Sequence, residues 1–333
     1  MAPRQLMASA LTFTCVTLSL ATFAGGSHYG ITPGALPQIA GNAKEWPVPT
    51  PEFARDPAPG PDGNIYIAVM NGNKIARFDT KTEKFNEWEL PRGARPHGLL
   101  VDGDGVVWYT GNGNGTIGEL DPKTGKVTSH KAPSGGDPHT LVIDDKGTIW
   151  FSVQGGNRIG RLERASGKIT EYETSGRPYG IALDKQGNVW FCRIGADMLG
   201  RLDPQTGKID DLKTGPGSAP RRLALAPDGM LWVTGYGNGK LIKVDPRAKK
   251  IVKEYAMPAG VAGGPYAVNV DGAGRVWANE IKTDTVALLD PKTEAFRVIK
   301  LPSSDVGIRK AIVDAKGRYW YMGSHNGRLG VIE

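Results

Sequence analysis

The chain has 333 residues, of which 39% are hydrophobic and 23% charged, as in ordinary globular proteins and unlike disordered ones. Its net charge of +7 is mild and scattered, and no basic helix or aromatic–basic motif is present, which argues against nucleic acid as a partner. Glycine, at 46 residues, has roughly twice its usual share, which favours short strands and many turns over a helical fold.

The first residues have the pattern of a secretory signal. Arg4 is the only charged residue among the first 40, and an apolar run over residues 6–24 ends in small residues. We therefore predict a signal peptide over residues 1–24 and a periplasmic or secreted protein, without membrane attachment after cleavage. The alternative is an uncleaved anchor, because the run is near the ~18 residues needed to span a bilayer. Cleavage leaves a single cysteine, Cys192, so no disulfide framework is expected.

A short motif then recurs along the chain, with a glycine followed three residues later by an aromatic residue. The pairs are Gly63 and Tyr66, Gly105 and Trp108, Gly147 and Trp150, Gly187 and Trp190, Gly229 and Trp232, Gly274 and Trp277, and Gly317 and Trp320. Successive glycines are 42, 42, 40, 42, 45 and 43 residues apart. This is the period of a four-stranded propeller blade, so the chain is predicted to be an all-β, seven-bladed β-propeller over residues 43–333.

Each repeat is expected to supply four strands. An apolar first strand, as at 180–184, is followed by a tight turn and by a second strand with the aromatic residue, as at 189–191. The third strand resembles 158–162, and a turn such as 121–125 leads to a polar fourth strand. Because the aromatic residues recur at a fixed phase, we expect them to pack between neighbouring blades.

The last repeat lacks its fourth strand, and the start of the propeller supplies a candidate for it. The chain ends at 330–333, whereas residues 43–49 resemble the fourth strand at 85–91. We predict that this N-terminal strand joins the last blade and closes the ring, which removes open sheet edges. Residues 25–42 have no strong pattern and are predicted to be an irregular lead-in.

Seven equivalent positions on the first strands are the candidate ligand-binding residues. They lie five residues before the end of each first strand and are Arg55, His97, His139, Tyr179, Arg221, Tyr266 and Arg309. A core position would be apolar or small, whereas this ring is polar, aromatic and cationic, which favours a ligand-facing surface. A solvated channel rim is the alternative.

Two neighbouring repeats supply candidate catalytic and metal-binding residues near this ring. They contain Pro-His pairs at His97 and His139, which the propeller would place on adjacent blades, and Asp137 lies two residues before His139. A neutral imidazole can act as a base near neutral pH or bind a metal, and a carboxylate can hold a divalent cation.

The repeats at 150–152, 157–162 and 178–181 resemble those of the virginiamycin B lyase family of streptogramin B-inactivating propellers. The resemblance spans about residues 43–333. It implies elimination across an ester linkage, without water, assisted by Mg²⁺. By position it implies His139 as the base, and Asp137 and Gln154 as metal-holding residues where the family has two glutamates. His97 becomes a substrate contact, and we assign the other five ring residues to substrate binding as well.

Three hypotheses remain at this point. The first is a metal-assisted carbon–oxygen lyase, or a lactonase-like hydrolase, built on His139. Against it, Asp137 is shorter than glutamate, Gln154 is neutral, and the arginines of the ring disfavour a cation. The second is a non-catalytic, exported propeller that binds an anionic small molecule, glycan or peptide on the channel face. A scaffold in an envelope complex is a third possibility, and in each case we expect a monomer.

Overall fold

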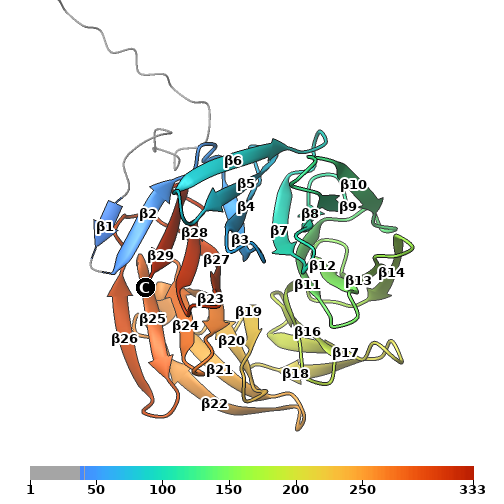
Figure 1. The fold of residues 1–333 in the computed structure, drawn as a ribbon. Helices are drawn as coiled ribbons and strands as arrows, with labels where there is room; N and C mark the ends of the chain where they lie inside the picture. The colour runs from blue at the N-terminus through green and yellow to red at the C-terminus, as the bar shows by residue number, and fades with distance from the viewer. Residues whose placement is uncertain (1–37, 41) are drawn as a thin grey trace, which may run out of the picture.

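The computed structural model describes residues 38–40 and 42–333. They form seven antiparallel sheets that stand in a ring around a central axis (Figure 1), so the predicted seven-bladed propeller is confirmed. The predicted signal peptide and most of the predicted lead-in lie outside the described residues. No helix in the described part of the chain is long and apolar enough to cross a membrane.

The strands follow the repeat in chain order. Blade 1 contains β3 (Ala54–Pro59), β4 (Ile65–Val69), β5 (Lys74–Asp79) and β6 (Lys84–Glu89), and blade 2 contains β7 (Pro96–Val101), β8 (Val107–Gly111), β9 (Thr116–Leu120) and β10 (Val127–Lys131). Blade 3 contains β11 (Pro138–Ile143), β12 (Ile149–Val153), β13 (Arg158–Glu163) and β14 (Lys168–Glu173), and blade 4 contains β15 (Pro178–Leu183), β16 (Val189–Arg193), β17 (Met198–Leu202) and β18 (Ile209–Lys213). Blade 5 contains β19 (Pro220–Leu225), β20 (Leu231–Gly235), β21 (Lys240–Asp245) and β22 (Lys250–Ala256). The short helix α1 (Gly260–Gly263) precedes blade 6, which contains β23 (Pro265–Val270), β24 (Val276–Glu280), β25 (Thr285–Asp290) and β26 (Ala295–Lys300).

Blade 7 joins the two ends of the propeller. It consists of β27 (Ile308–Val313), β28 (Tyr319–Gly323), β29 (Arg328–Ile332) and the N-terminal β2 (Ala43–Pro47), which pairs antiparallel with β29. The predicted closure is therefore confirmed, and β2 lies beside β29 in Figure 1. A further strand, β1 (Gln38–Ala40), pairs with β2 inside the stretch that we expected to be irregular. Its pairing covers the outer edge of β2, which would otherwise present unpaired backbone groups.

The second-strand aromatic residues fill the spaces between blades, as the repeat predicted. Trp150 of blade 3, for example, is 1% exposed and packs in one cluster with Ile181, Val189 and Phe191 of blade 4. Trp108, Trp190, Trp232, Trp277, Trp320 and Tyr66 lie in the six corresponding clusters. The hydrophobic core is therefore a set of seven wedges between sheets rather than one central mass.

Hydrogen bonds in the turn between the first and second strands explain why an aspartate lies three residues before the glycine of the repeat. In blade 3, Asp144 Oδ1 accepts hydrogen bonds from the backbone N–H groups of Lys146 and Thr148, both at 2.9 Å. Its Oδ2 accepts from Trp150 Nε1 at 3.1 Å. One carboxylate thus shapes the turn and fixes the tryptophan in the next wedge. Asp102, Asp184, Asp271 and Asp314 do the same in their own blades.

Candidate functional site

The seven first strands surround the axis, and each is interrupted by a bulge just after it begins. In blade 3, Pro138 pairs with Val153 and Leu141 pairs with Phe151, so two residues of β11 oppose one residue of β12. The same irregularity occurs in the other six blades. Bulges redirect side chains away from the normal alternation of a strand. The first bulge residue of every blade is one of the seven ring residues predicted from the sequence.

Polar side chains of the second strands stabilise these bulges. The Ser152 hydroxyl accepts from Thr140 N at 3.2 Å and donates to Tyr179 O of the next blade at 2.7 Å. Thr110, Thr234 and Asn279 form equivalent bonds in blades 2, 5 and 6. Our sequence reasoning missed these residues. The sequence feature that could have identified them is a polar residue in an otherwise apolar second strand, two positions after the aromatic residue.

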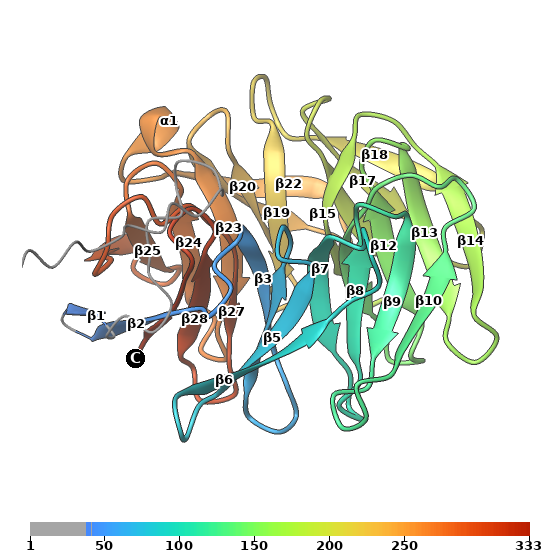
Figure 2. The ribbon, with the colours of Figure 1, turned by 90° about the horizontal axis from the view of Figure 1, so that it is seen from above.

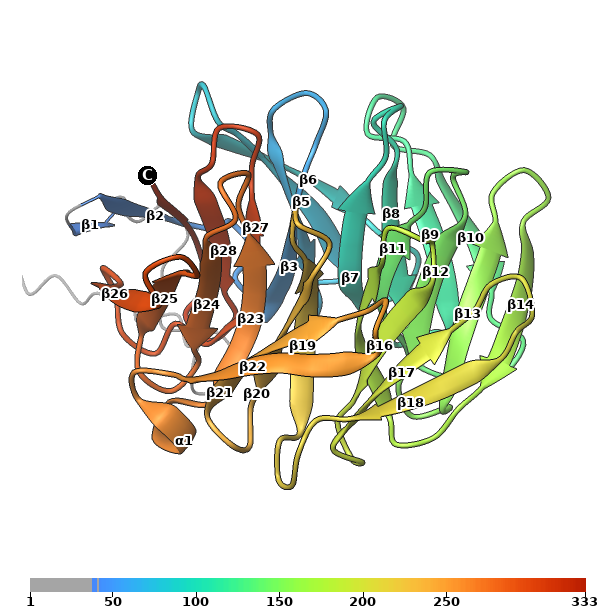
Figure 3. The same ribbon diagram turned by 90° about the horizontal axis from the view of Figure 1, so that it is seen from below.

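A cavity of about 600 Å³ opens on the face of the ring that carries α1. Figures 2 and 3 show α1 protruding from that side of the ring. All nine predicted site residues line it: Arg55, His97, Asp137, His139, Gln154, Tyr179, Arg221, Tyr266 and Arg309. The nine residues thus lie around one cavity, and their catalytic, substrate-binding and metal-binding roles stay predictions. The lining also includes Arg177, Tyr236, Lys282 and His325, which our site prediction did not include.

The rings of the two predicted histidines lie in contact, tilted by 40° to each other. The ring centres of His97 and His139 are 3.7 Å apart, and His139 lies 4.0 Å from the Tyr179 ring. His97 Nδ1 donates to the His139 carbonyl oxygen at 3.1 Å, so its Nε2 is the acceptor for Arg55 Nη2. Burial, the Arg55 charge and the neighbouring imidazole lower the pKa of His97 well below its usual range. His97 is thus a neutral side chain whose two nitrogens are both engaged.

His139 is connected to the interior of the channel through a threonine. Its Nδ1 lies 3.0 Å from Thr140 Oγ1, and Arg222 Nη1 donates to the same hydroxyl oxygen at 2.8 Å. Burial and the charges of Arg222 and Arg55 lower the pKa of His139 well below its usual range. The imidazole is therefore neutral near pH 7. Its Nε2 has no hydrogen-bond partner among the described residues and can act toward the cavity as a donor or as a base, depending on the tautomer.

The opposite half of the cavity is cationic and aromatic. Arg221 Cζ lies 4.6 Å from the centre of the Tyr236 ring and 5.6 Å from that of Tyr179. Arg309 Nη2 donates to His325 Nε2 at 3.1 Å, and His325 Nδ1 donates to Asp305 at 2.9 Å. His325 therefore orients Arg309, much as His97 orients Arg55.

The three arginines of the ring have unused hydrogen-bonding capacity. Their Nε atoms are buried and have no partner among the described residues. None of the three guanidinium groups forms an ion pair with a described carboxylate. Arg55 is buried, and Arg221 and Arg309 are half-buried. Cations shielded from water without a counter-charge are costly, and an anionic ligand would neutralise them. The cavity is therefore chemically suited to anions.

Two tyrosines complete the floor of the cavity. The hydroxyl groups of Tyr179 and Tyr266 share a hydrogen bond across the channel. Burial, together with the proximity of Tyr266, raises the pKa of Tyr179 to about 12. For Tyr266, burial is outweighed by the positive charges of Arg55 and Arg309, and the pKa is lowered. Tyr266 is therefore the more acidic of the two phenols, and Arg55 and Arg309 favour its deprotonated form.

The residues expected to hold Mg²⁺ do not fit that ion. Asp137 Oδ1 is already bonded to Gly155 N at 2.5 Å, and Gln154 adds only a neutral amide. The described part of the chain contains no group of three His, Cys, Asp or Glu side chains placed to bind a metal. Mg²⁺ prefers several oxygen ligands with carboxylates among them, and here one carboxylate faces several guanidinium groups.

Comparisons with known proteins agree with this architecture. The family model described as "Virginiamycin B lyase family" matches residues 36–176 and 96–333. A streptogramin B lyase structure matches with a TM-score of 0.79 and 25% identity, covering 87% of this chain and 96% of that one. Virginiamycin B lyase from Staphylococcus aureus matches with a TM-score of 0.79 and 23% identity, covering 87% and 98% of the two chains.

A protein with a different name has the same fold. Hydrazine synthase from Kuenenia stuttgartiensis matches with a TM-score of 0.72 at 14% identity, covering 84% of this chain and 95% of that one. A search of curated proteins gave no match. Since one propeller architecture carries different names, the chemistry has to be argued from the cavity itself.

Proposed function

This chain belongs to the virginiamycin B lyase family, and we propose that its cationic cavity binds a small anionic molecule, glycan or peptide. One observation carries the proposal: Arg55, Arg221 and Arg309 converge on one cavity without forming an ion pair to any described carboxylate. Guanidinium groups hold carboxylates and phosphates in fixed, bidentate geometry. The aromatic rings around them would enclose the non-charged part of the ligand.

His139 fits the same role in one of its two tautomers. Since Arg222 donates to Thr140 Oγ1, the threonine hydrogen is available to donate to His139 Nδ1. His139 Nε2 then carries a proton and becomes a fourth donor on the cavity. In that state the histidine binds the ligand and does not act as a base.

Calorimetric titration tests the binding proposal. Inorganic phosphate, succinate and an acidic disaccharide serve as probes, each with a neutral analogue, in the presence and absence of EDTA. We expect chelator-insensitive binding of at least one anion, weakened about tenfold or more in Arg221→Ala and in Arg309→Ala. Lys253→Ala, on the outer strand β22, is the matched control. Equal binding of the neutral analogues would contradict the proposal.

Elimination at an ester linkage is the second candidate, and it is favoured by the neutral imidazole of His139 on the cavity surface. In the other tautomer, Nδ1 donates to Thr140 and Nε2 has a free lone pair. His139 would take the proton next to a carbonyl, a carbon–carbon double bond would form, and the ester carbon–oxygen bond would break to release a carboxylate. The arginines would stabilise the enolate that develops.

A streptogramin B depsipeptide tests the lyase candidate directly. Elimination gives a linear product of unchanged mass, whereas a lactonase-like reaction adds one water, and mass spectrometry separates the two. The lyase proposal predicts loss of turnover in His139→Ala and retention of the fold. Titration with Mg²⁺ is run in parallel, and measurable heat at millimolar concentration would restore a metal-assisted mechanism. A ¹⁵N spectrum of His139 reports the tautomer and so distinguishes base from donor.

We also propose that the chain is exported to the periplasm or the medium and acts there as a monomer, without nucleic acid or membrane attachment. The apolar run at residues 6–24, which ends in small residues, supports the export part of this proposal. Cell fractionation with N-terminal sequencing of the mature protein tests it. A product that retains residues 1–24 in the membrane fraction would contradict it.

A further inference from the structure

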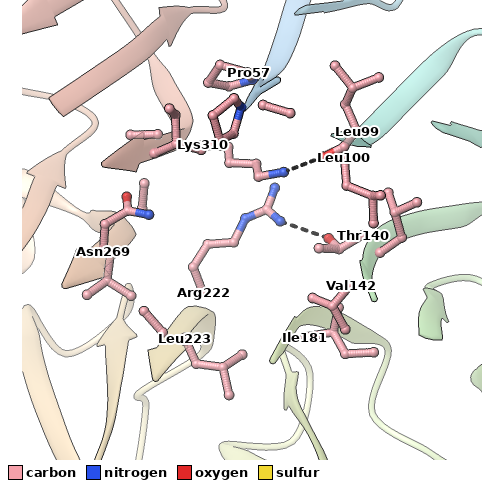
Figure 4. Close-up of a pocket in the computed structure, with 18 of the residues that line it drawn as sticks. Pro57, Leu99, Leu100, Thr140, Val142, Ile181, Arg222, Leu223, Asn269 and Lys310 are labelled. Carbon is pink, nitrogen blue, oxygen red and sulfur yellow. Dashed lines mark hydrogen bonds between the residues drawn. The ribbon is translucent and has the colours of Figure 1, made fainter. Parts of the chain in front are cut away.

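The opposite end of the channel contains a second cavity, of about 400 Å³, which shares no lining residue with the first (Figure 4). Its walls are the later parts of the first strands. Its apolar lining includes Leu99, Leu100, Val142, Ile181, Leu223 and Ile312. The volume lies in the range of roughly 300–1,000 Å³ that is usual for small-molecule sites.

The base of this cavity is charged. The second bulge residues of blades 1, 5 and 7 are Asp56, Arg222 and Lys310, and they meet near the axis. Asp56 is 0% exposed, and its Oδ2 lies 3.6 Å from Arg222 Nη2 and 3.7 Å from Lys310 Nζ. These contacts are ion pairs that are too long for hydrogen bonds. One carboxylate is therefore shared by two cations.

Other contacts hold both cations in place. Arg222 Nη1 donates to Thr140 Oγ1 at 2.8 Å, and Lys310 Nζ donates to the Leu99 carbonyl oxygen at 3.0 Å, as Figure 4 shows. The two positive groups point toward each other in the middle of the apolar ring. Their positions are thus set by the protein and do not require a ligand.

The charges at this point do not balance. Arg222 and Lys310 bring two positive charges and Asp56 one negative charge. Arg222 Nη2 and both Asp56 oxygens have no hydrogen-bond partner among the described residues, and neither does Asn269 Oδ1 on the cavity wall. Burial lowers the pKa of Lys310 although Asp56 opposes the effect, which reflects the cost of a buried cation. One further anion would complete the site.

We propose that this second cavity binds an aliphatic carboxylate. Its carboxylate group would lie between Arg222 and Lys310 and supply the missing negative charge. Its hydrocarbon chain would extend along the leucine, valine and isoleucine side chains toward the open end. A single excess positive charge beneath an apolar wall favours a monoanion with a hydrocarbon tail over a phosphate or a sugar acid.

The first experiment is a calorimetric titration of the full chain with octanoate, with octan-1-ol and acetate as matched controls. We expect octanoate to bind at least about tenfold more tightly than either control, because only octanoate has both the charge and the chain. Equal affinity for acetate would show a bare anion site and overturn the proposal. Equal affinity for octan-1-ol would show a purely apolar site and overturn it as well.

Two substitutions at the base should change octanoate affinity in opposite directions. Lys310→Met removes a cation but keeps the length of the side chain, and we expect it to weaken binding about tenfold. Asp56→Asn removes the competing carboxylate and should strengthen binding by a similar factor. Arg221→Ala, in the other cavity, should leave octanoate binding unchanged. A shift of both base variants in the same direction would overturn the proposal.

A wall substitution keeps the test decisive if Asp56→Asn fails to fold, which thermal melting would reveal. Val142 is half-buried on the cavity wall, so Val142→Asp places a carboxylate beside the expected hydrocarbon chain. We expect it to abolish octanoate binding while leaving anion binding in the first cavity intact. Unchanged octanoate affinity in a folded Val142→Asp protein would place the ligand elsewhere and overturn the proposal.

Discussion

The second strands of the blades are nearly interchangeable, whereas the first strands differ from blade to blade at their bulge. Every second strand places an aromatic residue in the wedge to the next blade. The first bulge residues are instead arginine, histidine or tyrosine, and the second ones are glycine, alanine, threonine, aspartate, arginine or lysine. Equivalent aromatic contacts thus recur around the ring, while the ligand recognition that we propose depends on a few unequal positions near the axis.

The largest expected effect is on stability, from a substitution in the hydrophobic cluster between blades 3 and 4. Trp150→Ala should lower the free energy of unfolding by about 3–5 kcal/mol, because it leaves a cavity between two blades and Asp144 loses its indole partner. Urea denaturation followed by circular dichroism measures this loss. Trp150→Phe is the control and should cost less. A loss below about 1 kcal/mol would mean that the wedges do not carry the stability of the ring.

The second effect concerns the two neighbouring histidines of the cavity, His97 and His139. In the folded chain the pKa values of His97 and His139 are lowered well below that of an unfolded histidine, about 6.5. Below that pH the unfolded chain binds protons that the folded chain does not, so stability falls as the pH falls. Each histidine should contribute about 1.4 kcal/mol of loss per pH unit there, until its folded pKa is reached.

Denaturation curves between pH 7 and pH 5 measure this dependence. His97→Gln and His139→Gln should each flatten the profile, whatever their effect on stability at pH 7. His130→Gln, on the outer strand β10, is the matched control for the general effect of losing a histidine. Parallel profiles for the wild type and both channel variants would show that these imidazoles are not held neutral.

A smaller effect is expected from the bonds that join the bulges. Thr234→Val keeps the shape of the side chain but leaves Arg222 N and Tyr266 O without their partner. The expected loss of unfolding free energy is roughly 1–3 kcal/mol. Thr234→Ser retains the hydroxyl group and should restore most of it. If valine and serine behave alike, the bulges do not depend on these bonds.

The smallest effect separates the two proposals for the first cavity. Asp137→Asn removes the carboxylate that competes with an anionic ligand, and affinity for such a ligand should rise roughly two- to fivefold. If Asp137 instead holds a metal ion, the same substitution should reduce metal binding and turnover. Titration of the variant with the best-binding anion and with Mg²⁺ decides between these outcomes.

The repeat made the fold predictable because the glycine and the aromatic residue each meet a structural requirement that recurs in every blade. Gly147 occupies the left-handed conformation of the turn, with φ 78°, and Trp150 must reach the next blade. Alignment of the repeats then identified the seven ring residues, and all of them line one cavity. The short strand β1 was missed because three residues at the edge of a blade have no periodic signature.

Other features of the two cavities could not be read from the repeat. A period of two predicts which residues of a strand share a face, and a bulge breaks that alternation, so the inward position of Arg222 was not foreseen. The contact of Asp56 with Arg222 and Lys310 joins blades that are distant in sequence. The orientation of Arg309 by His325 depends on a loop conformation that single-sequence patterns do not specify.

The pairing of β2 with β29 also determines the order in which the molecule can be assembled. Residues 43–47 emerge from the ribosome long before residues 328–332, and they have no partner in blade 7 until the final strand has been synthesised. A chain that stops short of β29 would therefore leave β2 and β28 as exposed edges, able to pair with other molecules. Joining the ends in this way makes completion of synthesis a condition for a closed, non-aggregating product.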